Sequence, residues 1–287
     1  MREITVLSGK GGTGKTSITA ALGSLARDTV FCDNDVDASD LHLIFDPSIE
    51  EEHPFHGGWK AAIDPEACSQ CGACIRYCRF GAIIESRSGP PEVDPFRCEG
   101  CRLCERVCPS DAIHSERTAN HAWYVSSTRF GTLVHARMAP GEENSGKLVT
   151  AVRKRAREIA VDHGASFIIN DGPPGIGCPA IASLSGADLA LIVLEPGKTA
   201  LHDAGRLIDL IGSFQIPSYA ILNKWDIDRD MALQITAFLE ERSIPLLTRL
   251  PFQREMVEAM VERKTIVEYR PGSEISKKLR NLWEDLP

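Results

Sequence analysis

Short apolar runs alternate along the chain with longer segments of helical periodicity. Runs of this kind are typical of strands buried on both faces of a parallel sheet. They lie at residues 4–7, 29–33, 166–170, 189–194, 219–222 and 246–250. Apolar residues at three- and four-residue spacing predict helices over 15–26, 146–163, 199–213, 229–242, 252–263 and 274–285. This order predicts an α/β fold, a doubly wound and mostly parallel sheet with helices on both faces.

A cysteine-rich segment interrupts this pattern. Eight of the ten cysteines lie between Cys68 and Cys108. The N-terminus lacks the apolar core of a signal peptide, so we expect a cytoplasmic protein. In a reducing compartment, a cysteine cluster indicates metal or redox chemistry rather than a disulfide framework.

The spacing of these cysteines repeats. Each half reads C-x2-C-x2-C-x3-C, in which one loop supplies three thiolates to a [4Fe–4S] cluster and the fourth cysteine reaches the other cluster. The first quartet is Cys68, Cys71, Cys74 and Cys108. The second quartet is Cys98, Cys101, Cys104 and Cys78. Zinc is the competing metal, but it usually takes two separated CxxC pairs and leaves the third close cysteine of each run without a role.

Residues 61–116 resemble the two-cluster bacterial ferredoxins. The residues after the fourth cysteine of each run also repeat, as Arg79-Phe80-Gly81-Ala82-Ile83 and Pro109-Ser110-Asp111-Ala112-Ile113. Arg79 is a departure, since those ferredoxins usually have proline there. The resemblance implies a small α+β ferredoxin-like domain at 61–116, inserted into a discontinuous domain of residues 1–60 and 117–287.

A phosphate-binding loop follows the first predicted strand. The segment Gly9–Thr16 fits G-x-x-x-x-G-K-[ST] and lies between a strand and a helix, as a P-loop does. Its backbone N–H groups would face the phosphates of ATP or ADP, Lys15 the β- and γ-phosphates, and Thr16 the Mg²⁺ ion. The predicted nucleotide-binding residues here are Gly9, Lys10, Gly11, Gly12, Thr13, Gly14, Lys15, Thr16 and Ser17.

The loop carries a second lysine, Lys10, and so resembles the deviant Walker A motif of MinD/ParA-type P-loop ATPases, whose relatives include the nitrogenase iron protein and Mrp-type carriers. In that family the extra lysine crosses a nucleotide-sandwich dimer to the partner's phosphates. The resemblance therefore implies an ATP-dependent homodimer or a homologous heterodimer. The alternative is that Lys10 only neutralises the phosphates of its own chain.

Aspartates in two further segments extend the resemblance. The run Asp33–Leu41 resembles the family's switch I, which implies that Asp35 activates the attacking water and that Asp33 serves the outer Mg²⁺ shell. Asp37 is a further candidate. Asp171 ends the strand at 166–170 and would reach Mg²⁺ through water, before the switch II run Gly172–Gly177. The catalytic roles fall on Lys10, Lys15 and Asp35.

Weaker similarities identify the residues expected near the base of the nucleotide. Asn223 follows a predicted strand and resembles the family's adenine-contacting asparagine. Pro251, in Leu250-Pro251-Phe252, resembles the segment beside the base.

Four further features carry plainer expectations. We expect Cys178 to be a small buried residue rather than a ligand between subunits, and residues 50–58 to be a linker. The C-terminal apolar positions are expected to dock on the protein's own core rather than on a membrane. A solvated basic face, rather than DNA binding, is expected for Lys147, Arg153, Lys154, Arg155 and Arg157.

The formal charge of −8 argues against bulk attraction to nucleic acid or anionic lipid. No apolar run approaches the roughly 20 residues that span a bilayer. The two motifs together predict an ATPase whose nucleotide-driven dimerisation gates electron transfer through, or assembly of, iron–sulfur centres, with a redox or iron–sulfur partner protein. The alternatives are a carrier that delivers clusters to apoproteins, as Mrp-type relatives do, and a positioning or partitioning ATPase, which would leave the cysteines unexplained.

Overall fold

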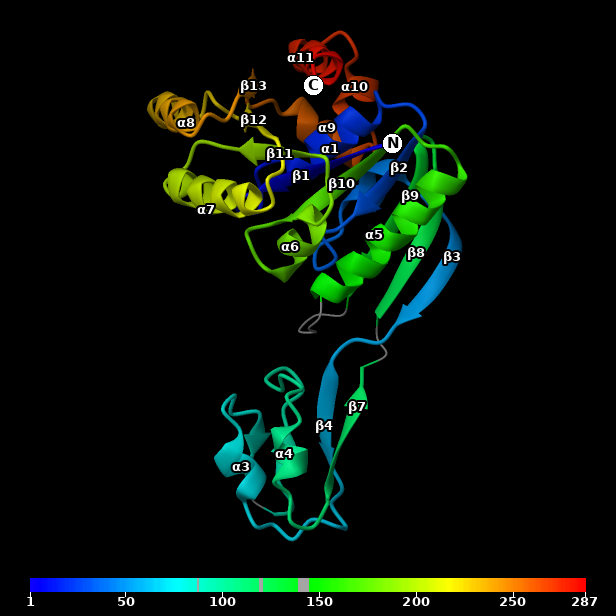
Figure 1. Ribbon diagram of the computed structural model, residues 1–287, viewed down its shortest axis with the longest axis vertical. Coiled ribbons are helices and arrows are strands. Elements are labelled where there is room, and N and C mark those ends of the chain that lie inside the picture. Colours follow the sequence, from blue (N-terminus) through cyan, green and yellow to red (C-terminus); the bar gives the residue numbers. More distant parts are fainter. Residues whose placement is uncertain (87, 119–120, 139–144) are drawn as a thin grey trace. The chain divides into compact units, whose positions relative to one another are not determined.

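The computed structural model describes residues 1–86, 88–118, 121–138 and 145–287 (Figure 1). The chain forms two compact units. The first, called here the sheet unit, comprises Met1–Glu52, Trp123–Arg137 and Ser145–Pro287. The second, called the cysteine unit, is built on His53–Ala122.

Nine strands of the described chain form one sheet in the order β13-β12-β11-β1-β10-β2-β9-β8-β3. The run from β13 to β9 is parallel at every pairing. All six predicted strands are present, so the expected α/β fold with a mostly parallel sheet is confirmed. The strands are β1 (Arg2–Ser8), β2 (Thr29–Asp33), β3 (Ser48–Phe55), β8 (His121–Thr128), β9 (Gly131–Arg137), β10 (Phe167–Pro174), β11 (Leu189–Leu194), β12 (Ser218–Asn223) and β13 (Leu246–Leu250).

Strand β11 shows why its apolar run is continuous. Its odd-numbered residues, such as Leu191, pack with α1 (Lys15–Gly23), α10 (Ile266–Tyr269) and α11 (Glu274–Glu284). Its even-numbered residues, such as Ile192, pack with α6 (Cys178–Leu184), α7 (Ala200–Ser213) and α8 (Arg229–Glu241). Successive side chains of a strand point to opposite faces, so helices on both faces require apolar residues at every position.

Helix α5 (Ser145–Asp162) lies along β2 and β9 (Figure 1). The short helices α2 (Leu41–Phe45) and α9 (Glu255–Val261) complete this unit. The prediction for the C-terminus is confirmed: Ile275, Leu279 and Leu282 of α11 are buried in the core. No helix in the described ranges is both long and apolar enough to span a bilayer.

The linker predicted at 50–58 contains the boundary between the two units, after Glu52, but its residues up to Phe55 belong to the edge strand β3. Glu50 and Glu52 are exposed or half-exposed on this strand. Charged side chains are common on edge strands, where they discourage pairing with other chains. Because these positions are charged, the strand does not appear as an apolar run in the sequence.

The cysteine unit is small and built from short elements. Strand β4 (Trp59–Ile63) pairs antiparallel with β7 (Ile113–Arg117), and β5 (Ile83–Ile84) with β6 (Glu92–Val93). Helices α3 (Ala73–Tyr77) and α4 (Leu103–Arg106) contact each other.

The sequence repeat of this unit is also a repeat of backbone conformation. Residues thirty positions apart share a positive φ, a backbone angle that residues other than glycine seldom adopt. The pairs are Gln70 and Gly100, Gly72 and Arg102, and Gly81 and Asp111.

Candidate functional site

The predicted P-loop connects β1 to α1 in the sheet unit. Gly12 and Gly14 have φ of 80° and 86°, values that favour glycine. A Cβ atom at Gly14 would lie 2.5 Å from Asn223 Nδ2, so the close approach of these two segments also requires a glycine. The loop therefore places its backbone N–H groups at the start of α1 without side chains in the way.

Lys15 is buried among carboxylates. Its Nζ lies 2.8 Å from Asp171 Oδ1 and 3.9 Å from Asp35 Oδ2. Burial alone would lower the Lys15 pKa, but the carboxylates of Asp171, Asp33 and Asp35 outweigh it and raise that pKa. Lys15 is therefore a fixed positive charge at the start of α1.

Asp171 connects the P-loop helix to β10. The Thr16 hydroxyl donates to Asp171 Oδ2 at 2.7 Å, and the Thr19 hydroxyl donates to Oδ1 at 2.9 Å. A hydroxyl and a carboxylate are hard oxygen ligands of the kind that Mg²⁺ prefers, directly or through water. Two of the three predicted Mg²⁺ residues, Thr16 and Asp171, are thus brought together although they are far apart in sequence.

Switch I is organised by a buried aspartate. Asp33 accepts hydrogen bonds from the Ser39 hydroxyl at 2.7 Å and from the Leu41 N–H at 3.1 Å. Burial and the nearby Asp171 raise the pKa of Asp33 to about 7, against the attraction of Lys15. Burial also raises the pKa of Asp35 to about 6. Carboxylates crowded in this way favour a cation between them.

A cavity of about 720 Å³ joins these groups to an apolar end, a volume suited to a nucleotide. The P-loop, Asp35 and Asp37 line it at the polar end. Asn223 also lines it and donates from Nδ2 to the Thr13 carbonyl at 2.7 Å, so in this structure it supports the loop. The apolar end is lined by Pro251, Phe252, Met256, Val257 and Met260.

The predicted base segment contained Pro251, but sequence reasoning missed the residues of α9 beside it. Met256 and Met260 are four residues apart and therefore share one face of that helix. The sequence predicted a helix at 252–263 with these apolar residues. It did not show that this helix lies beside the nucleotide cavity.

Lys10 is held beside the loop by an ion pair that the sequence did not predict. Its Nζ lies 3.0 Å from Glu195 Oε1, and Lys224 Nζ lies 2.8 Å from Glu195 Oε2. Lys224 also donates to the Gly12 carbonyl at 2.7 Å. Burial alone would raise the Glu195 pKa, but the two lysines lower it overall. Glu195 and Lys224 follow β11 and β12, at the strand ends where α/β sites form.

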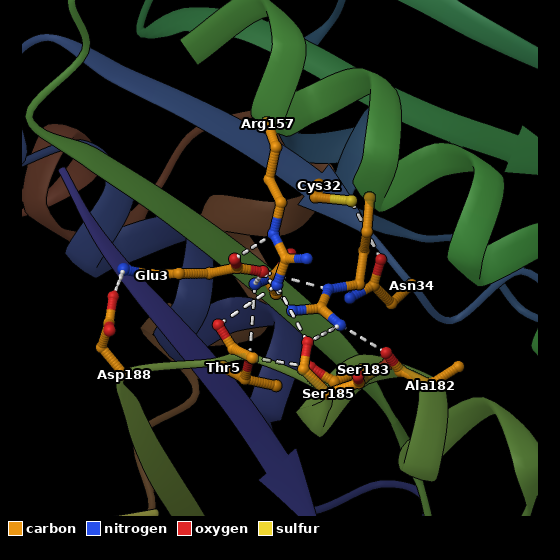
Figure 2. Close-up of polar contacts among 12 residues, drawn as sticks. Glu3, Thr5, Cys32, Asn34, Arg157, Ala182, Ser183, Ser185 and Asp188 are labelled. Atoms are coloured by element: carbon orange, nitrogen blue, oxygen red, sulfur yellow. Dashed lines mark hydrogen bonds and ion pairs between the residues drawn. The ribbon is translucent and has the colours of Figure 1, made fainter. Parts of the chain in front are cut away.

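A buried polar network surrounds Glu3 in the sheet unit (Figure 2). Glu3 of β1 accepts from Arg157 Nε at 2.6 Å and from Arg153 Nε at 3.0 Å. Arg153 also donates to the Ser185 carbonyl at the end of α6, at 2.9 Å. Asn170, next to Asp171, donates to Glu3 at 2.9 Å. The network thus ties α5 and α6 to the strands that carry the P-loop and Asp171.

This network corrects one expectation for the basic helix. Arg153 is buried, not solvated, because its guanidinium is needed to neutralise Glu3 inside the unit. Other charges of α5 are also paired: Arg155 with Glu51 at 3.0 Å, and Lys154 with Glu158 at 4.0 Å.

Each predicted quartet lines one cavity of the cysteine unit. Cys68, Cys71, Cys74 and Cys108 line one, and Cys78, Cys98, Cys101 and Cys104 line the other. The Ala82 N–H donates to Cys78 Sγ at 3.4 Å, and the Ala112 N–H to Cys108 Sγ at 3.3 Å. Across the described residues, no three His, Cys, Asp or Glu side chains are arranged to hold a single metal ion.

The expectation that Cys178 is buried is wrong. It is the first residue of α6, and its side chain is exposed.

Comparison with known proteins places this geometry in a family. Residues 4–266 match the model of the CobQ/CobB/MinD/ParA nucleotide binding domain. An uncharacterised protein of Methanocaldococcus jannaschii is 34% identical over 226 residues, covering 77% of this chain and 78% of that protein. The septum site-determining protein MinD of Buchnera aphidicola is 21% identical over 282 residues, covering 93% of this chain and 84% of that protein.

Among solved structures, MinD of Pyrococcus horikoshii complexed with Mg-ADP has a TM-score of 0.61 at 18% identity, covering 99% of this chain and 94% of that one. The low identity shows the fold alone, whereas the family match rests on sequence. The P-loop between β1 and α1 and the carboxylates around Lys15 are consistent with this fold and with this family. The chain belongs to the CobQ/CobB/MinD/ParA nucleotide-binding family, and it is a P-loop ATPase of the MinD/ParA type.

Proposed function

We propose that this ATPase couples nucleotide-driven dimerisation to two [4Fe–4S] clusters held by the cysteine unit, and so gates electron transfer through them or their assembly. One observation carries the proposal: each cavity of the cysteine unit is lined by one of the quartets that the spacing defines. Both cavities take their fourth cysteine from the other half of the repeat, as ferredoxin spacing requires.

The chemistry of these cavities fits a cluster better than a single ion. Each thiolate of a [4Fe–4S] cluster binds a different iron, so the four sulfurs surround the cluster instead of converging on one point. The backbone N–H groups of Ala82 and Ala112 donate to two of the sulfurs, an interaction that favours the charged thiolate. When bound, the clusters would supply one-electron transfer. Residues 61–116 are then the ferredoxin-like domain, inserted between residues 1–60 and 117–287.

The sheet unit would hold Mg-ATP in its cavity. Lys15 and the loop N–H groups would contact the phosphates, and Thr16, Asp33 and Asp171 would surround the Mg²⁺ ion. Asp35 would orient the attacking water. Asn223 and Pro251 would lie near the base, with the apolar side chains of α9 against its face.

Lys10 would leave Glu195 and contact the phosphates of a second subunit, a homodimer partner or a homologous chain. The insert lies between the two switch segments in sequence. If the switches move on ATP binding, they would pull on the chain that leads into and out of the cysteine unit.

The fold supports a second candidate, a positioning or partitioning ATPase. The solved structures that share it include a MinC:MinD cell division complex of Aquifex aeolicus, with a TM-score of 0.60 and 18% identity, covering 99% of this chain and 94% of that one. That function gives the eight clustered cysteines no role. It also predicts an iron-free protein, which makes the two candidates easy to separate.

The test uses the full chain purified without oxygen. We expect about eight irons and eight sulfides per chain, the content of two clusters. The reduction potential and reoxidation rate should then change when Mg-ADP is replaced by a non-hydrolysable ATP analogue. Lys15→Ala is the control, since it should keep the iron but lose the nucleotide response. Stoichiometric zinc, or an iron-free protein, would contradict the iron–sulfur function; a nucleotide-insensitive potential would contradict the gating.

A further inference from the structure

The two halves of the cysteine unit share a backbone repeat but differ in the side chains around their quartets. Tyr77, Phe80 and Leu103 line the cavity of the second quartet. The positions thirty residues away along the repeat hold Val107, Ser110 and Ala73. Ser110 and Ala73 line the cavity of the first quartet, which therefore has small residues at two positions where the second has Phe80 and Leu103.

The large side chains of the second quartet are exposed. Tyr77 is 52% exposed, Phe80 46% and Leu103 39%. Single exposed apolar residues are ordinary, but three around one cavity form a patch of the kind that marks a protein contact. Aromatic residues are also enriched at the centres of protein interfaces.

The two quartets also differ in the charged residues near them. Arg76 and Arg79 flank Tyr77 and Cys78, and both are exposed. Neither forms a salt bridge within the described part of the chain, and Glu99 is the one acidic residue among those lining the second cavity. Near the cysteines of the first quartet in sequence, the exposed charged residues include the acidic Asp64, Glu66 and Asp111, and Arg106, the equivalent of Arg76.

We propose that the face around the second quartet, formed by Tyr77, Phe80 and Leu103 with Arg76 and Arg79, is the docking site for an acidic one-electron carrier protein. The inference rests on the proposed function, because the carrier would exchange one electron with the centre held by that quartet. The matching surface is an apolar centre ringed by carboxylates. Apolar contact removes water between the partners, and opposite charges steer their encounter.

This surface also gives Arg79 a role. Proline is usual at this position in the resembled ferredoxins, and the second half of the repeat has proline there, as Pro109. An arginine next to Cys78 attracts a carboxylate to the edge of the second cavity. The first quartet has Pro109 in place of this arginine, and Ser110 in place of Phe80, so it lacks the same surface.

The probe is a flavodoxin, an acidic one-electron carrier, titrated calorimetrically into the iron-loaded full chain without oxygen at low ionic strength. We expect it to bind and basic cytochrome c not to bind. Phe80→Ser installs the residue of the equivalent position and should weaken binding about tenfold, as loss of an apolar anchor does. Arg79→Glu should weaken binding and reduce its salt dependence. Glu66→Gln, beside the first quartet, is the matched control and should leave binding unchanged.

The inference is overturned if flavodoxin fails to bind, if both variants bind it as tightly as the original chain, or if cytochrome c binds in its place. Iron and sulfide are measured in every sample, so the two levels of failure stay separate. An iron-free preparation defeats the proposed function. An iron-loaded one whose flavodoxin binding ignores both substitutions defeats only the docking site.

Discussion

The sheet unit and the cysteine unit are stabilised in different ways. The sheet unit buries apolar side chains on both faces of its sheet, in the two clusters that contain Ile192 and Leu191. In the cysteine unit, the described buried cluster consists of Cys74, Ile83 and Ile113. Cys78, Cys104 and Cys108 are among the partly buried residues packed against it. The candidate ligands thus supply much of the apolar contact of their own unit.

The difference is one of size. A unit of this length buries too little apolar surface to offset the entropy of ordering its chain, and small domains usually need a metal or a cross-link. The polar groups of the nucleotide site, by contrast, are already paired with one another: Lys15 with Asp171, and Glu195 with two lysines. We expect the cysteine unit to depend on its clusters for folding, and the sheet unit to fold without a ligand.

Removal of iron tests this contrast most directly and should have the largest effect. After anaerobic chelation, amides of β4 and β7 should lose nearly all protection from hydrogen exchange, because their unit loses its centre. Amides of β1 and β10 should stay protected, and ATP should still bind. Hydrogen exchange read by mass spectrometry gives both halves in one experiment. Unchanged protection of β4 and β7 would show that the cysteine unit folds on its apolar residues alone.

Lys15→Ala is the reverse experiment, aimed at the sheet unit. Nucleotide affinity should fall by about a hundredfold or more, because the charge that faces the β- and γ-phosphates is lost. Iron content should not change, since the cysteine unit is held separately. Calorimetric titration with Mg-ATP measures the affinity, and Lys264→Ala, an exposed lysine, is the control. Nearly normal affinity would move the phosphate contact away from Lys15.

Asp35→Ala separates binding from hydrolysis within the nucleotide site. Binding should stay close to normal, while turnover should fall about a hundredfold, the usual effect of losing a group that activates water. Phosphate release under saturating Mg-ATP is the measurement. Asp37→Ala is the matched variant, since Asp37 also lines the cavity. If Asp37→Ala is the slow enzyme and Asp35→Ala is not, the catalytic role belongs to Asp37.

Lys10→Ala tests whether the sheet unit works as a dimer. In an Asp35→Ala background, the added substitution should keep ATP binding through Lys15, Thr16 and the loop N–H groups but abolish ATP-dependent dimerisation. The γ-phosphates of a sandwich repel each other, and one lysine from each chain offsets this repulsion in a site shielded from water. Analytical ultracentrifugation in Mg-ATP measures it. Equal dimerisation with and without Lys10 would confine Lys10 to its own chain.

Glu195→Gln should produce the smallest effect, a change in the strength of ATP-dependent dimerisation. It refines the test of Lys10. Lys10 must leave Glu195 before it can reach a second chain, and a partly exposed ion pair of this kind is worth about 0.2–1 kcal/mol. The variant should therefore dimerise in Mg-ATP at a protein concentration a few-fold lower. Sedimentation at several concentrations gives the constant, with Glu240→Gln as the exposed control. Weaker dimerisation would mean that Glu195 positions Lys10 for the contact instead of restraining it.

Patterns that are local in sequence could be read without a structure. The strands β1, β2 and β10 to β12 contain apolar runs because both of their faces are buried, and the P-loop requires its glycines within a few residues of one another. The cysteine spacing is local in the same sense. The division of the cysteines into two cavities follows the assignment made from spacing.

The sequence by itself therefore determined the parallel sheet, the position of the P-loop and the family, since each depends on residues close together along the chain. Only the tertiary structure decided which distant groups meet. Glu195 approaches Lys10 because β11 pairs beside β1, Arg153 is buried because Glu3 lies beneath α5, and β3 is a strand because the sheet offers it an edge. Ion pairs and edge strands carry no apolar period, so their partners appear only when the chain is folded.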